Sequence, residues 1–148
     1  MEIDWNFLWC DNSIHHCSWI SIQPDSLIMS NEKCMCDTGD KIVLACSGAS
    51  DVGCISDKVA RSLQVAGKRK MSCLALVGAG IQKSIDNFKT KDLLVIDGCP
   101  IACGRRIVKK HDFANYKHVV ITDYGFKKGE TPVSDKTVIE VLSKVVEL

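Results

Sequence analysis

From residue 41 onward, short apolar runs alternate with amphipathic stretches. The runs lie at 42–46, 71–77, 93–96 and 118–121, and each has the length of a buried strand. Between and after them, apolar residues recur every three or four positions, which predicts helices with one buried face. The pattern therefore predicts four strands that alternate with four helices.

Capping residues indicate where the helices begin. Ser50 or Asp51 can cap the first helix, and Ser134 or Asp135 can cap the last. Pro100 predicts the start of the third helix, because its missing N–H costs nothing at the first helical position, and this helix is expected to run to about His111. The apolar stripes that face the core are Val52, Ile55, Val59, Leu63 and Ala66; Ile81, Ile85 and Phe88; and Val138, Val141, Leu142 and Val145.

This order predicts an α/β protein. Short continuous apolar strands separated by helices are typical of a parallel sheet that is covered on both faces. The expected architecture is a small doubly wound, Rossmann-like three-layer sandwich with about four parallel strands. Its crossover connections are expected to be right-handed.

The first 40 residues differ in composition from the rest. They hold seven acidic residues and one basic residue, and all three tryptophans, and they show no sustained helical or strand period. We predict an irregular N-terminal extension over residues 1–39 and one α/β domain over residues 40–148.

The net charge and the hydrophobicity of the chain exclude some classes of function. The net charge of +1 gives no general attraction to nucleic acid or to an anionic membrane. No apolar run approaches the ~20 residues that a membrane-spanning helix needs, and the N-terminus lacks the pattern of a secretory signal. The sequence therefore predicts a cytoplasmic protein with neither a nucleic acid nor a membrane as partner.

Cysteine is the unusual residue of this chain. There are nine cysteines in 148 residues, and a chain of this length folds without disulfides. In a reducing compartment such a number indicates metal or thiol chemistry.

Four of the cysteines lie where a parallel sheet would bring them together. Cys46, Cys73 and Cys99 fall at or near the carboxyl ends of three predicted strands, and Cys103 follows Cys99 by one helical turn. Ligands gather at that edge of open α/β sheets, and four thiolates match a structural zinc site. Cys54 lies near this edge, whereas the other thiols belong to the irregular part: Cys10, Cys17, Cys34 and Cys36.

These residues also carry a resemblance to a known family. The stretch ACSGASDVG at 45–53, the Cys73-Leu74-Ala75 triplet and the DGCP tetrapeptide at 97–100 with Cys103 resemble the DGC-domain family, which is named for its Asp-Gly-Cys motif. The resemblance runs from about residue 40 to the C-terminus. It implies zinc binding by four shared cysteines, which fall on Cys46, Cys73, Cys99 and Cys103.

Two other uses of the same thiols stay open. In a thiol redox or sulfur-transfer enzyme, Cys99 would be the attacking thiolate and Cys103 or Cys46 the resolving thiol. Four thiolates also suit an iron–sulfur cluster, so zinc is the expected cofactor and the cluster is its alternative. The sequence leaves open whether the protein is an enzyme.

The sequence lacks the motifs of two other kinds of site, a cysteine phosphatase and a nucleotide-binding loop. A C-x5-R phosphatase loop would need an arginine where Val52 stands, and the chain has neither G-x-G-x-x-G nor a P-loop lysine. The carboxylates nearest the predicted site, Asp51 and Asp97, are expected to fix a helix start and a turn. The basic residues between 105 and 118 are expected to form a solvated face.

Overall fold

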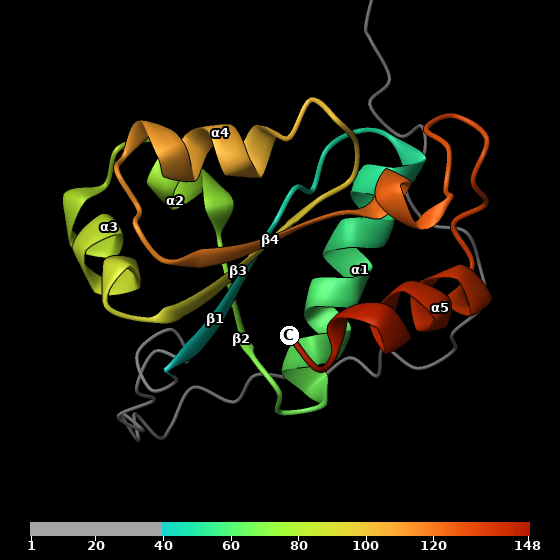
Figure 1. The fold of residues 1–148 in the computed structure, drawn as a ribbon, viewed down its shortest axis with the longest axis horizontal. Coiled ribbons are helices and arrows are strands. Elements are labelled where there is room, and N and C mark those ends of the chain that lie inside the picture. The colour runs from blue at the N-terminus through green and yellow to red at the C-terminus, as the bar shows by residue number, and fades with distance from the viewer. Residues whose placement is uncertain (1–39) are drawn as a thin grey trace, which may run out of the picture. The chain divides into compact units, whose positions relative to one another are not determined.

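The computed structural model describes residues 40–148, and the predicted irregular extension lies outside this range. The elements are, in chain order, β1 (Lys41–Ala45), α1 (Asp51–Val65), β2 (Lys70–Ser72), α2 (Leu74–Gly78), α3 (Gln82–Lys89), β3 (Asp92–Asp97), α4 (Cys103–Lys110), β4 (Tyr116–Val120), the 3-10 turn η1 (Ile121–Tyr124) and α5 (Asp135–Val145) (Figure 1). The four strands pair in parallel in the order β2-β1-β3-β4. The predicted Rossmann-like fold is confirmed.

Helices cover both faces of the sheet, with α1 and α5 on one side and α2, α3 and α4 on the other (Figure 1). Alternate strand residues supply the two hydrophobic clusters. Val43 and Leu94 pack towards α1 and α5, whereas Leu44 and Val95 pack towards the other helices. All four side chains are fully buried. A strand that is buried on both faces reads as a continuous apolar run, which is why the sequence pattern predicted these strands.

Two predicted boundaries are wrong. The run 71–77 is not one strand, because β2 ends at Ser72 and residues Leu74–Gly78 form the short helix α2. In α2 only Val77 is buried, and Leu76 is 37% exposed. Periodicity alone does not distinguish a short apolar strand from a short helix.

The third predicted helix begins later than expected. Pro100 lies in a turn closed by the bond from the Ala102 N–H to the Cys99 carbonyl, and α4 starts only at Cys103. Ala102 has left-handed backbone angles, with φ 51° and ψ 53°, and so separates the turn from the helix. This conformation is unfavourable for a residue with a Cβ.

The amino ends of the strands are locked by a buried arginine. The Arg69 guanidinium donates to the backbone carbonyls of Ile42, Asp92 and Leu148 and to the Asp92 carboxylate, which it contacts at 3.0 Å. Its side chain is only 4% exposed. One residue therefore joins β1, β3 and the last residue of the chain.

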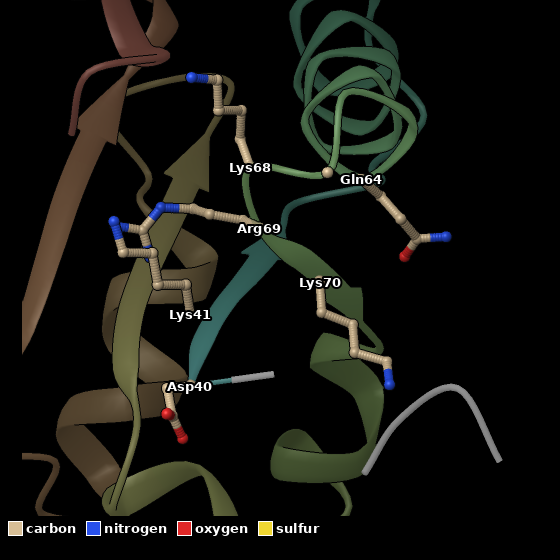
Figure 2. A pocket seen from close by; sticks show the side chains of 7 residues that line it. Asp40, Lys41, Gln64, Lys68, Arg69 and Lys70 are labelled. Atoms are coloured by element: carbon tan, nitrogen blue, oxygen red, sulfur yellow. The ribbon is translucent and has the colours of Figure 1, made fainter. Parts of the chain in front are cut away.

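Arg69 also borders a cavity of about 360 Å³ at this edge (Figure 2). Lys41, Lys68 and Lys70 contribute to its lining, and the Arg69 side chain extends away from Lys70 (Figure 2). The cavity lies at the amino ends of β1 and β2, opposite the edge where parallel sheets bind ligands. We assign this edge a structural role.

Replacing Arg69 by methionine is expected to destabilise the fold by about 3 kcal/mol, because it leaves buried carbonyls and a carboxylate without their donor. Urea denaturation measures the loss. Arg61→Met is the matched control: the Arg61 side chain is 67% exposed and pairs with Asp57 within one helix, so its loss should cost less than about 1 kcal/mol. Equal losses of stability in Arg69→Met and Arg61→Met would contradict this stabilising role of Arg69.

Candidate functional site

The connections of the sheet place a switch point between β1 and β3. From β1 the chain crosses through α1 to β2 on one side, and from β2 it crosses through α2 and α3 to β3 on the other side. Ligands of doubly wound folds bind at the carboxyl ends of the strands at such a point. Cys46 directly follows β1, and Cys99 follows β3 by two residues. Both thiols therefore belong to the part of the fold best placed for a site.

Hydrogen bonds fix the backbone of Cys46 on both sides. Its N–H donates to the Ile96 carbonyl at 2.9 Å. The hydroxyl of Ser56, which is fully buried in α1, lies 2.6 Å from the Cys46 carbonyl oxygen and 3.2 Å from that of Ile96. Ser56 thus ties α1 to the ends of β1 and β3. Sequence reasoning missed it, since a serine on the apolar face of a helix has no distinctive spacing.

Asp97, the last residue of β3, organises the other half of the site. Its carboxylate accepts the backbone N–H groups of Gly104 and Arg105 at 2.7 and 2.9 Å, and it lies 2.9 Å from His118 Nε2. Asp97 is fully buried. The carboxylate caps α4 from outside the helix. Its role is structural as expected, but it fixes the start of this helix and not the turn before Cys99. The prediction that His118 belongs to a solvated face is wrong, because His118 lies in β4 and faces Asp97.

Gly98 allows two backbones to approach closely. A Cβ at this position would lie 2.7–2.8 Å from the backbone atoms of Val52 and Gly53, in the first turn of α1. A Cβ at Gly53 would likewise lie 2.8 Å from the Gly48 carbonyl oxygen. The segments that follow β1 and β3 therefore both rest on the start of α1, and this contact positions Cys99.

Cys103 is electrostatically linked to two other thiols. Burial raises its pKa most, and the negative charges of Cys46, Asp97 and Cys99 raise it further, against a smaller opposite effect of Arg106. Cys103 is the first residue of α4, and it directly follows the turn that the Ala102 N–H closes on the Cys99 carbonyl. Cys99 and Cys103 are thus joined by one short turn at the carboxyl edge.

Cys73 joins the group from the other side of Cys46. It follows β2 and precedes α2, and together with Cys46 it lines a cavity of about 580 Å³ at the carboxyl edge. Cys54 is exposed on α1 and does not line this cavity. The remaining four cysteines lie outside the described residues.

Within residues 40–148, no group of three or more histidine, cysteine, aspartate or glutamate side chains is gathered closely enough to hold a metal ion as it stands. Charges influence one another over distances longer than the ~2.3 Å of a zinc–sulfur bond, so thiols can be neighbours without forming a coordination sphere. The ligand set Cys46, Cys73, Cys99 and Cys103 therefore stays a prediction.

Asp51 holds the loop that borders the site on its other flank. Ser50, not Asp51, caps α1: its side chain accepts the Gly53 N–H. The Asp51 carboxylate instead accepts the backbone N–H groups of Gly129 and Thr131, both at 2.9 Å. The bond from Gly129 is the main reason why the pKa of Asp51 lies below its ordinary value.

The parallel sheet, the switch point and the Asp-Gly-Cys turn define a class of small α/β domains with several thiols at the carboxyl edge. A model of the DGC domain matches residues 42–145, and the chain belongs to the DGC domain family. Among curated proteins, the chain is similar to the anaerobic and virulence modulator AnvM of Pseudomonas aeruginosa. The two are 31% identical over 88 residues, which cover 59% of this chain and 67% of AnvM. No solved structure matches the chain.

Among the described residues, no helix is both long and apolar enough to cross a bilayer.

We expect Gly98→Ala to destabilise the domain by about 2 kcal/mol, because the new methyl group would have to displace the backbone of α1. Thermal unfolding of Gly98→Ala checks this expectation. The control is Gly78→Ala, whose Cβ would meet only the Ile107 side chain, at 3.5 Å. Gly78→Ala should leave the stability unchanged or slightly higher. A Gly98→Ala variant as stable as Gly78→Ala would disprove the close approach.

The lowered pKa of Asp51 predicts how its loop responds to acid. Because the folded-state pKa lies below 3.8, the carboxylate stabilises the fold above that pH, and this contribution is lost as the pH falls through the folded-state pKa. In an NMR titration, the amide proton signals of Gly129 and Thr131 should shift with a midpoint below 3.8. Asp51→Asn should remove this titration. A midpoint above 3.8 would refute the assignment.

Proposed function

We propose that the protein binds one zinc ion through Cys46, Cys73, Cys99 and Cys103 at the carboxyl edge of its sheet. One observation supports the proposal: Cys46, Cys73 and Cys99 each follow a parallel strand at the carboxyl edge of the sheet, and the turn after Cys99 leads directly to Cys103. Partial burial and nearby negative charge also raise the pKa of the Cys103 thiol.

The same repulsion that keeps a proton on Cys103 favours a divalent cation. Ionising several neighbouring thiols is unfavourable while nothing compensates their charge, but a cation converts that repulsion into attraction. Zinc binding would therefore release protons and become tighter as the pH rises. Thiolate sulfur is a soft donor, and an all-cysteine set is typical of structural zinc sites.

The positions of the thiols suit closure around an ion. Cys46 and Cys99 are partly exposed, and Cys73 and Cys103 are exposed, so each side chain has room to rotate. Cys103 follows Ala102, whose left-handed conformation costs on the order of 1–2 kcal/mol. Backbone strain of this kind is concentrated at functional sites, and here it lies inside the turn that joins Cys99 to Cys103.

The thiol-enzyme alternative fits the geometry less well. The nucleophile of such an enzyme must be ionised near neutral pH, and the raised pKa of Cys103 opposes this for the residue at the start of α4. Cys99, the nucleophile of that alternative, lies four residues before α4 and so outside the first turn of this helix. An iron–sulfur cluster would use the same ligands. Metal analysis and visible absorption distinguish it from zinc.

Metal analysis of protein purified without oxygen tests the proposal. We expect about one zinc per chain and no visible absorption. Cys103→Ser and Cys46→Ser should each lower the zinc content severalfold, while circular dichroism shows that the fold is kept.

Cys54→Ser is the matched control, because Cys54 is an exposed cysteine of the same domain that does not line the carboxyl-edge cavity. This variant should keep its zinc. Broad visible absorption together with bound iron would show that the cofactor is an iron–sulfur cluster and not zinc. Protein that neither contains zinc nor binds added zinc, or that loses it equally in Cys54→Ser, would refute the proposal.

A further inference from the structure

The cavity that contains Cys46 and Cys73 has the size and walls of a small-molecule site. Its volume of about 580 Å³ falls in the range of ligand pockets. It lies at the carboxyl ends of β1 and β2 and extends between α1 and the helices of the opposite face. Met71, Leu74 and Ile107 make part of its lining apolar.

One wall of the cavity carries an ordered ion pair. Arg61 Nε donates to Asp57 Oδ2 at 2.6 Å, and Ser47 Oγ donates to Asp57 Oδ1 at 2.8 Å. Partial burial works to raise the pKa of Asp57, but the hydrogen bonds from Arg61 and Ser47 outweigh it and hold the pKa below its usual value. Both partners are therefore charged at neutral pH.

An arginine beside an aspartate is complementary to a zwitterion. A guanidinium has five N–H donors, and the bonds to Asp57 engage two of its nitrogens, Nε and Nη2. The Arg61 side chain is 67% exposed, so a ligand can reach it. A carboxylate of the ligand would accept from Arg61, and an ammonium group would donate to Asp57.

A buried hydroxyl adds a second polar contact. Ser72 lines the cavity and is 8% exposed, and its Oγ is buried with no hydrogen-bond partner in the described part of the chain. An unpaired buried hydroxyl is unfavourable, and native structures usually satisfy it. The Ser72 hydroxyl is therefore an unpaired polar group in a residue that lines the cavity.

We propose that this cavity binds low-molecular-weight disulfides of amino-acid thiols, and that Cys73 exchanges with them. The Cys73 thiol loses its proton, its sulfur attacks one sulfur of the ligand, and the ligand's S–S bond breaks. A mixed disulfide remains on Cys73, and the departing thiolate takes up a proton from water. The ligand is itself the oxidant, so the electrons balance.

The structure selects Cys73 among the described thiols. Cys73 is exposed and lines the cavity, whereas Cys46 also lines it but is only partly exposed. Cys54 is equally classed as exposed but lies outside the cavity. A difference in rate between Cys73 and Cys54 therefore reports on the cavity and not on exposure alone.

Oxidised glutathione is the probe, because each half carries an α-ammonium and an α-carboxylate group. The reduced full chain is freed of metal by a chelator, so the result does not depend on zinc binding. Peptide mass spectrometry then follows the mixed disulfide at each cysteine with time. Cys73 should react at least about fivefold faster than Cys54, and Arg61→Gln should slow Cys73 about three- to fivefold, the range of an exposed charged contact.

Two controls isolate the recognition of the ligand's charge. Lys58→Gln removes a positive charge from the same helix outside the cavity lining, and it should change the Cys73 rate less than twofold. Bis(2-hydroxyethyl) disulfide, which is uncharged, should react equally with wild type and Arg61→Gln. Equal rates for Cys73 and Cys54, or equal effects of Arg61→Gln and Lys58→Gln, would overturn the proposal.

Discussion

The carboxyl edge of this domain depends on one buried carboxylate. Asp97 is fully enclosed, and a buried charge is tolerated only when donors surround it. Two backbone N–H groups of α4 and the His118 ring provide them. The carboxylate therefore joins β3, β4 and α4 at one point, and it decides that α4 begins at Cys103. Cys99 and Cys103 both lie in the segment between Asp97 and the two amide groups that its carboxylate accepts.

The three residues of the Asp-Gly-Cys motif have separate structural tasks. Asp97 anchors the next helix, and Gly98 lets the chain pass within van der Waals distance of α1, where any side chain would collide with backbone. Only the third residue offers a reactive group. Ser56 completes the arrangement from α1, because its hydroxyl lies within hydrogen-bond distance of the carbonyl oxygens of Cys46 and of Ile96, the residue before Asp97. The thiols are thus carried by backbone that is fixed on several sides.

The sequence predicted the sheet well, because strands buried on both faces must be continuously apolar, and Leu44 and Leu94 lie in such runs. It also placed Cys46 and Cys99 correctly after their strands. It failed where a distant partner decides the local structure. The start of α4 is set by Asp97 rather than by the preference of Pro100 for the first helical position. Arg69 and Ser56 act on carbonyls 10 to 79 residues away in sequence. No local pattern records such partners, and none gives the distances between four sulfur atoms.

The amino edge of the sheet is held by buried hydrogen bonds, whereas the carboxyl edge carries accessible thiols. The proposed zinc binding and disulfide exchange both belong to the carboxyl edge. At the amino edge, the Arg69 guanidinium donates to four acceptors and holds β1, β3 and the last residue together. At the carboxyl edge, the partly exposed Cys46 and the exposed Cys73 line a cavity together with Ser72, whose hydroxyl is unpaired among the described residues. Cys73 belongs to both the proposed zinc site and the proposed exchange site. A sulfur bound to zinc has its electron pair engaged and attacks disulfides slowly, and a sulfur in a mixed disulfide no longer ligates. Zinc and small disulfides would therefore compete for this one residue, and each would weaken the binding of the other to the same extent.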